Sequence, residues 1–277
     1  MFAAVGHADI GERIARSGRS GVQLRRTVVP DEQIPAGSSK LCGHPDLPAS
    51  VPWPRGPKRE LDFLAQLNAA EVHAWGMKDV PASGLLLFFY DQLVQPWGSV
   101  DTDRVLWRVL HVPTEGLVRT RPPRRWFRKK LAAVTTPAAR LVGVPRMTYL
   151  TSVLTLEDGE NETVYGQMEE LHRAVDEDLD GEPKHMTGGI ADHVQNPIFE
   201  CAELDVFGES AAEGSVRGGF DADRRAEARG WSLLLQLDSD DELGWCWGDL
   251  GMLYFAVPRD ELRAGRFEHA SMQLQCY

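Results

Sequence analysis

Two distant parts of the 277-residue chain carry the same succession of features, and this parallel constrains the fold most strongly. In each part, a segment rich in glycine and proline precedes an apolar run that ends in Gln-Leu-Asn or Gln-Leu-Asp. A glycine-led apolar run then follows. Gln66 in LAQLN corresponds to Gln236 in LLQLD, and Gly84 in GLLLFF corresponds to Gly251 in GMLYF. Apolar strands also resemble each other by chance, but the shared glutamine favours repetition of one structural unit.

The parallel predicts a domain organisation. We expect one compact domain over residues 1–277, made of a first repeat unit at 20–113, a variable connecting region at 114–184 and a second repeat unit at 185–277. Short apolar runs bounded by turn residues predict strands at 22–29, 61–68, 84–91, 105–112, 147–156, 232–241, 251–258 and 270–277. Helical spacing predicts helices or helical turns at 8–17, 69–75, 124–142, 162–179 and 259–267. The expected fold class is α+β, internally duplicated, with mainly antiparallel sheets and a few short helices on the outside.

Composition excludes several classes of protein. The net charge of −11 argues against non-specific binding to nucleic acid. The four cysteines form no Cys-x-x-Cys pair, so no zinc or redox motif is indicated, and reduced thiols are expected. Charged residues interrupt the N-terminal apolar residues, and no apolar run approaches the ~20 residues that span a bilayer. We therefore expect a cytoplasmic protein with no membrane association and no cofactor.

Two blocks of opposite charge lie in the middle of the chain. Residues 119–130 hold seven basic and no acidic residues, and residues 157–182 hold eleven acidic residues and one arginine. The basic patch comprises Arg121, Arg124, Arg125, Trp126, Arg128, Lys129 and Lys130. Basic and aromatic side chains together suit contact with phosphates and bases, or with an anionic membrane surface. Pairing of the two blocks within the chain, or a protein partner, is at least as plausible an interpretation.

The motifs SKLCGHPDLPASVPWP, LDFLAQLN, HMTGGIADHVQ, LLLQLDSDDELGWCWGD and GMLYF together resemble the YwqG-like family of bacterial domains. The resemblance covers nearly the whole chain, although residues 119–130 match no family motif. It implies an α+β fold with internal duplication and no established activity. The family pattern prefers glycine where this chain has Cys42, so the backbone of that turn is expected to differ slightly.

Acidic and histidine side chains offer one candidate chemistry. Asp238, Asp240 and Asp241 follow a predicted strand, and clustered carboxylates suit a hard cation. The spacing does not match an EF-hand loop, so a solvated or capping acidic turn is the alternative. His44 and His193 lie in the glycine- and proline-rich segments, but no metal-binding spacing such as HExxH includes them. No nucleophile motif is present.

Aromatic and amide side chains offer a second candidate, a surface for a ligand or partner. Trp247 could stack on a bound molecule, and Asp249 could accept hydrogen bonds from it. The alternative is a tight turn with buried tryptophans. Gln66 and Gln236 end apolar strands, where an amide must be satisfied; hydrogen bonds to the backbone of the preceding loops are the favoured interpretation. The full set of candidate binding residues is His44, Trp53, Gln66, His193, Gln236, Trp247 and Asp249.

The sequence therefore favours a non-enzymatic intracellular binding protein with an unidentified protein partner and an undetermined oligomeric state. Analogy with the family's character suggests an accessory or immunity role in a bacterial conflict system. The first alternative is a metal-assisted hydrolase that uses the acidic turn Asp238–Asp241 with the loop histidines. The second and weaker alternative is a nucleic-acid adaptor that binds through residues 119–130.

Overall fold

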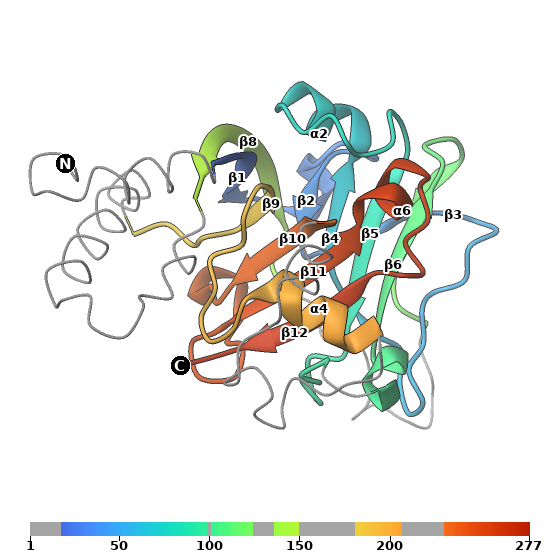
Figure 1. The fold of residues 1–277 in the computed structure, drawn as a ribbon. Helices are drawn as coiled ribbons and strands as arrows, with labels where there is room; N and C mark the ends of the chain where they lie inside the picture. Colours follow the sequence, from blue (N-terminus) through green and yellow to red (C-terminus); the bar gives the residue numbers. More distant parts are fainter. Residues whose placement is uncertain (1–17, 99–100, 124–135, 150–180, 207–229) are drawn as a thin grey trace, which may run out of the picture.

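The computed structural model describes residues 18–98, 101–123, 136–149, 181–206 and 230–277 (Figure 1). The strands are β1 (Arg19–Val28), β2 (Lys40–Leu41), β3 (Asp46–Pro48), β4 (Asp62–Asn68), β5 (Leu85–Tyr90), β6 (Trp107–Val112), β7 (Leu117–Arg119), β8 (Ala139–Thr148), β9 (Met186–Gly188), β10 (Trp231–Asp238), β11 (Met252–Pro258) and β12 (Ser271–Gln275). The α-helices are α2 (Ala69–Ala74), α4 (Ile198–Val206) and α6 (Arg259–Arg263), and single 3₁₀ turns cover η2 (Asp31–Gln33), η3 (Asp101–Val105) and η8 (Asp241–Leu243).

Ten strands form one antiparallel sheet in the order β12-β11-β10-β9-β1-β8-β2-β4-β5-β6, and β3 and β7 form a separate pair. The order is symmetric about its centre, where β1 and β8 pair along their whole lengths from Arg19–Thr148 to Val28–Ala139. Each half contains one short strand near the centre of the order, β2 or β9, which lies beside glycines and prolines. Three further strands lie between this short strand and the end of the sheet: β4, β5 and β6 in one half, and β10, β11 and β12 in the other. The first of the described strands, β1, pairs with β9 and so belongs to the half built mainly from the C-terminal residues.

The two halves also share an irregularity of register. Pairing of β4 with β5 shifts between Phe63 and Ala65, and pairing of β10 with β11 shifts between Leu233 and Leu235. The bulged residue lies two positions before the strand-end glutamine in both cases. The predicted strands β1, β4, β5, β6, β10, β11 and β12 are confirmed near their expected positions, as are the helical turns α2 and α6. The unit boundaries stay a prediction, and strand β8 lies inside the expected connecting region.

The expected α+β fold with helices on the outside is wrong. The described chain is dominated by the antiparallel sheet, which curls into a nearly closed barrel (Figure 1). The three α-helices have only six, nine and five residues. The two halves face each other across the interior, where the rings of Phe88 and Phe255 lie 5.2 Å apart. Strands of the opposite half therefore cover the inner face of the sheet.

The outer faces of the two halves are buried by different elements. Helix α4 packs on the outside of β11 and β12, and its Ile198 and Ala202 join a cluster with Trp231 of β10 and Tyr254 of β11. On β4 and β5, Phe63 and Phe89 pack instead beneath the chain around Leu47, Trp53 and Leu117. No helix in the described part of the chain is long and apolar enough to cross a bilayer.

The predicted helix at 124–142 is wrong where the structure describes it, because Ala139–Thr148 is strand β8. Its sequence alternates buried and exposed side chains at the start, as in Ala139, Arg140, Leu141 and Val142, and hydrogen bonds to β1 and β2 decide its conformation. The predicted helices at 8–17 and 162–179 lie outside the described residues.

Candidate functional site

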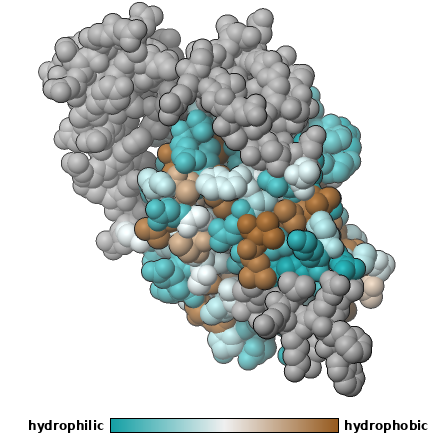
Figure 2. Space-filling view, turned by 90° about the horizontal axis from the view of Figure 1, so that it is seen from below, coloured by the Kyte–Doolittle hydropathy of each residue, from teal (hydrophilic) through white to brown (hydrophobic). Residues whose placement is uncertain are grey.

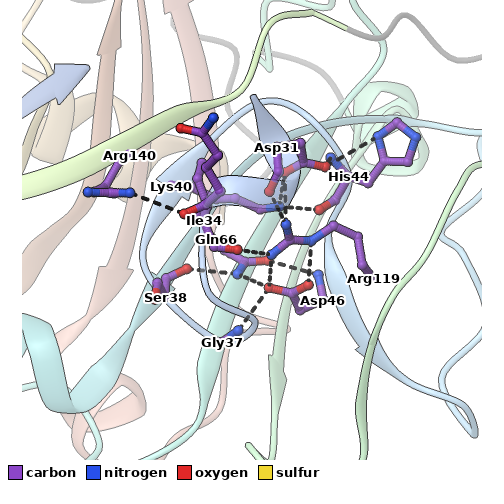
Figure 3. A network of polar contacts seen from close by, with 11 residues as sticks. Asp31, Ile34, Gly37, Ser38, Lys40, His44, Asp46, Gln66, Arg119 and Arg140 are labelled. Atoms are coloured by element: carbon purple, nitrogen blue, oxygen red, sulfur yellow. Dashed lines mark hydrogen bonds and ion pairs between the residues drawn. The ribbon is translucent and has the colours of Figure 1, made fainter. Parts of the chain in front are cut away.

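Six side chains meet behind the first glycine- and proline-rich loop and form what we call the Asp46 network: Asp31, Lys40, His44, Asp46, Gln66 and Arg119 (Figure 3). They come from separate elements, because Gln66 is on β4, Lys40 on β2 and Arg119 on β7. Sequence reasoning identified His44 and Gln66 and missed the four charged members. The two carboxylates and two cations balance in charge.

The carboxylate of Asp46 is the centre of this network. It accepts hydrogen bonds from Gly37 N at 2.9 Å, Gln66 Nε2 at 2.7 Å and Arg119 Nε at 2.9 Å. Burial alone raises the pKa of a carboxyl group, but these donors outweigh it and hold the pKa of Asp46 below its ordinary value. Asp46 is therefore a buried, ionised group whose charge Arg119 compensates.

Lys40 is fully buried on the other side of the loop. Its Nζ donates to Asp31 Oδ1 at 2.7 Å and to the carbonyl oxygen of His44. Burial lowers the pKa of Lys40 despite the hydrogen bond to Asp31. His44 Nδ1 has no hydrogen-bond partner and lies 3.8 Å from Asp31 Oδ2. The cations of the network are thus engaged within the protein and fasten the loop to the barrel.

Gln66 and Gln236 form the hydrogen bonds predicted for strand-end glutamines. Gln66 accepts from Asp46 N at 2.9 Å and donates to Ser38 O at 2.8 Å. Gln236 accepts from Asp192 N at 2.9 Å and donates to Lys184 O at 2.8 Å. The two glutamines therefore fasten equivalent loops in the two halves. Asp46 and Asp192 occupy matching positions, each eight residues after the loop carbonyl that accepts the glutamine's hydrogen bond. This repeated spacing was the signal in the sequence that could have identified Asp46.

At the ends of β2 and β9, two successive residues have positive φ in both halves, although the residue types differ. Cys42 has φ 57° and Gly43 has φ 68°, and the equivalent Gly188 and Gly189 have φ 68° and 73°. Cys42 adopts the left-handed conformation that glycine favours, and the expected small difference from the family's turn stays a prediction. Its thiol is buried, and burial raises the pKa of Cys42 far above the ordinary value.

The acidic turn is engaged in internal contacts. Asp240 forms ion pairs with Arg26 of β1, and its carboxylate accepts from Glu242 N at the start of η8. Asp238 accepts from Lys184 N at 2.9 Å, and Asp241 is exposed. Burial opposes ionisation of Asp240, but hydrogen bonds from His185 and Arg26 hold its pKa well below the ordinary value. Among the described residues, no group of three histidine, cysteine, aspartate or glutamate side chains is placed to hold a metal ion.

His185 pairs with the acidic turn, although the sequence suggested His44 and His193 for that role. His185 is fully buried, with Nε2 3.1 Å from Asp240 Oδ2, while Nδ1 accepts from Asp238 N at 3.1 Å. Both ring nitrogens are therefore occupied, which leaves neither to accept a proton from a substrate. The geometry gives the predicted metal-assisted hydrolase no support.

The remaining candidate residues lie in separate places. Trp53 donates to Leu61 O, and buried Trp247 donates to Asp238 O and packs against Tyr90. His193 Nδ1 accepts from Ile198 N at the start of α4, and burial lowers its pKa to about 4. Asp249 is exposed. Of the predicted basic patch, the structure describes Arg121, which is exposed; residues 124–130 lie outside the described part.

Exposed apolar side chains gather on two loops at the end of the barrel seen in Figure 2, where brown side chains lie in the middle of the face. The loop after β5 contributes Leu93, Val94 and Trp97, which are 57%, 56% and 49% exposed. The loop before β11 contributes Leu250, which is 62% exposed. We call these four residues the loop surface. Sequence reasoning missed this surface, because apolar residues in irregular loops have no periodic pattern that shows their exposure.

The fold and these loops define a barrel-like antiparallel-sheet protein in which two glycine- and proline-rich loops are fastened by equivalent glutamines. The chain belongs to the family described as domain of unknown function (DUF1963), whose model matches residues 39–276. The narrower resemblance to the YwqG-like family stays a prediction. No curated protein matches the chain.

Proposed function

We propose that this protein is a non-enzymatic binding protein that recognises a protein partner through the loop surface. The observation that carries the proposal is the exposure of Leu93, Val94, Trp97 and Leu250 on two loops that are tied together. Contiguous apolar area on a protein surface is typical of interaction sites, whereas scattered apolar residues are not.

The two loops are held in a fixed arrangement. Gln95 Nε2 donates to Cys246 O at 3.0 Å, and Gln95 Oε1 accepts from Gly248 N at 2.9 Å. Gln95 has φ 49° and Leu250 has φ 52°, a conformation that costs non-glycine residues free energy. Strained backbone of this kind concentrates at binding sites, and a surface that is already ordered loses less entropy when it binds.

The chemistry of the described polar clusters supports binding in preference to catalysis. The Asp46 network is balanced in charge, and both nitrogens of His185 are engaged. Within this proposal, an accessory or immunity role in a conflict system is a narrower form that rests on family character alone. No described contact favours the nucleic-acid alternative over it, and Arg119 at the start of the basic stretch is paired with Asp46.

The test compares capture of a partner by matched variants. Leu250→Asp places a charge in the loop surface, and aspartate tolerates the left-handed conformation better than leucine, so the fold is expected to persist. Val118→Asp on β7 is the control, because Val118 is 55% exposed and lies outside the loop surface. With tagged protein in a lysate of the producing cells, we expect the wild type and Val118→Asp to capture the same protein.

Leu250→Asp is expected to reduce that capture at least tenfold, since a buried unpaired charge at an interface costs several kcal/mol. Equal capture by Leu250→Asp and Val118→Asp would reject the loop surface as the binding site. Sedimentation of the purified wild type is run in parallel. A dimer that Leu250→Asp dissociates would mean that the surface binds a second copy of the chain, which also contradicts the proposal of a distinct partner.

A further inference from the structure

Strand β6 is at the end of the ten-stranded order, and its outer edge is a second surface, separate from the loop surface. Within the described chain, β6 pairs only with β5, from Leu85–Val112 to Tyr90–Trp107. Asp91 N donates to Leu106 O, in the same register. In antiparallel pairing the residues alternate between bonding the neighbour and facing away. Arg108 and Leu110 therefore bond β5, and the backbone groups of Trp107, Val109 and His111 point to the outer edge.

The edge opens into a groove at the seam of the nearly closed barrel. The groove encloses about 360 Å³, with β6 and Arg104 on one side and Gly265, Phe267 and Glu268 on the other. This volume lies in the range of ~300–1,000 Å³ that is usual for ligand pockets. The rings of His111 and Phe267 are 5.4 Å apart and join the two walls at one end. The groove is thus bounded by an unpaired strand edge along one wall.

Side chains along β6 alternate in character. Trp107 and Val109 are buried and belong to the barrel core, whereas Arg108 between them is exposed. A strand added beside β6 would place its side chains alternately toward the apolar interior and beside Arg108 on the outside. Opposite charges in such cross-strand positions are favourable. Arg104 also lines the groove on the side of β6, whereas Glu268 lies on the far wall. The outer side of the groove therefore favours an acidic residue.

We propose that the outer edge of β6 binds an extended segment of a partner protein by strand addition, and that this segment alternates apolar and acidic residues. Main-chain hydrogen bonds to Trp107, Val109 and His111 provide affinity, and the pairing with Arg108 provides selectivity. The proposal does not depend on the loop surface, since none of the four loop-surface residues lines the groove.

The probe is a capped eight-residue peptide in which valine alternates with glutamate, compared with the same peptide containing lysine in place of glutamate. Hydrogen exchange of the full chain is followed by NMR with and without each peptide. We expect the glutamate peptide to slow exchange at the amides of Trp107, Val109 and His111, and the lysine peptide to bind about tenfold more weakly. Arg108→Glu should reverse this preference. Arg140→Glu, the same charge change on an exposed arginine of β8, should leave it unaltered.

Three results would overturn the proposal. Slow exchange of these amides in the free protein would show that the edge is already paired. Binding that Arg108→Glu leaves unchanged, or that protects other amides, would place the peptide elsewhere. Protection that grows with protein concentration alone, together with a dimer in sedimentation, would identify a second copy as the occupant. Loss of partner capture through Leu250→Asp is measured separately, so failure of either proposal leaves the other standing.

Discussion

Gln66 illustrates how much a single buried amide supports in this molecule. Its side chain is fully buried. It accepts a hydrogen bond from Asp46 N and donates to Ser38 O and the Asp46 carboxylate. Gln66→Ala would leave these groups without that partner, at a cost of about 3 kcal/mol of unfolding free energy. Gln236→Ala removes two hydrogen bonds to backbone and none to a buried carboxylate, so about 2 kcal/mol is expected. Urea unfolding of both variants measures the difference.

The two glutamines serve as controls for each other, because each ends an equivalent strand. An unfolding free energy unchanged from wild type in both variants would contradict a fastening role. It would also return these residues to the set of candidates for ligand contact.

His193 is expected to make stability depend on pH in a defined window. Burial lowers its folded-state pKa to about 4, below the ordinary value of 6.5 in the unfolded chain. Between these values the unfolded chain binds the extra proton, so stability is lost as pH falls from about 6.5 towards 4. The loss for this group is at most about 3 kcal/mol. His193→Asn keeps an acceptor near Ile198 N and does not titrate.

The measurement is the unfolding free energy of the wild type and His193→Asn at intervals from pH 7.5 to 4.5. The wild type is expected to lose stability faster over this range than the variant. Parallel curves would show that His193 is ionised equally easily in the folded and unfolded chains. Comparing the variants removes the contribution of the other titrating groups.

Sequence reasoning reached some residues of the network and missed others for a physical reason. The strand-end glutamines carry a local signal, since an amide inside an apolar run requires partners nearby. Asp46 and Arg119 are 73 positions apart in the chain. Nothing local indicates that they pair, because β3 and β7 bring them together only in the folded protein.

At the scale of elements, the segment before η3 closes part of the seam on the β12 side. Trp97 O accepts from Leu274 N at 3.1 Å, and a Cβ on Gly98 would lie 1.7 Å from Met272 O. Gly98 also has φ 81°. Gly98→Ala should therefore push this segment off β12 and cost about 3 kcal/mol or more, since both strain and lost contacts contribute.

Gly116→Ala is the matched control for this change. Gly116 has φ 66°, but a Cβ there would meet nothing within 4 Å, so only the conformational cost of about 1 kcal/mol is expected. Thermal unfolding followed by calorimetry separates the two. Similar losses in both variants would show that the contact with β12 contributes little.

Strands with a clear apolar pattern in their own sequence could be predicted, and strands without one could not. β5 has six consecutive buried residues, and its apolar run identified it. β2 and β9 have two and three residues beside glycines and prolines, and they are strands only because neighbouring strands pair with them. Helix α4 was missed because the preceding segment reads as irregular chain. The curvature of the sheet was missed as well, because it depends on contacts between the halves.

At the scale of the whole molecule, one apolar interior is shared by both halves. Phe255 of β11 packs against Phe88 of β5 and Trp107 of β6. Phe255→Ala removes a fully buried ring and should cost about 3–5 kcal/mol. Because the interior is common, we expect amides of β5 to lose as much protection from hydrogen exchange as amides of β11.

Native-state hydrogen exchange measures this directly in the full chain. Loss of protection confined to β10–β12 would show that the halves open independently, and it would contradict a shared interior. Phe63→Ala on the outer face of β4 provides a comparison, because its cluster belongs to the first half alone.

The position of β1 has a consequence for how the protein is made. This strand leaves the ribosome before the other described strands, and its neighbours β8 and β9 are translated much later. Strands β2, β4, β5 and β6 are neighbours in the sheet and all lie within residues 40–112, so they can assemble early. β1 must therefore wait for β8 before it can pair, while the strands of the first half can already form their part of the sheet. Nascent chains arrested before β8 should therefore keep β1 accessible to chaperones.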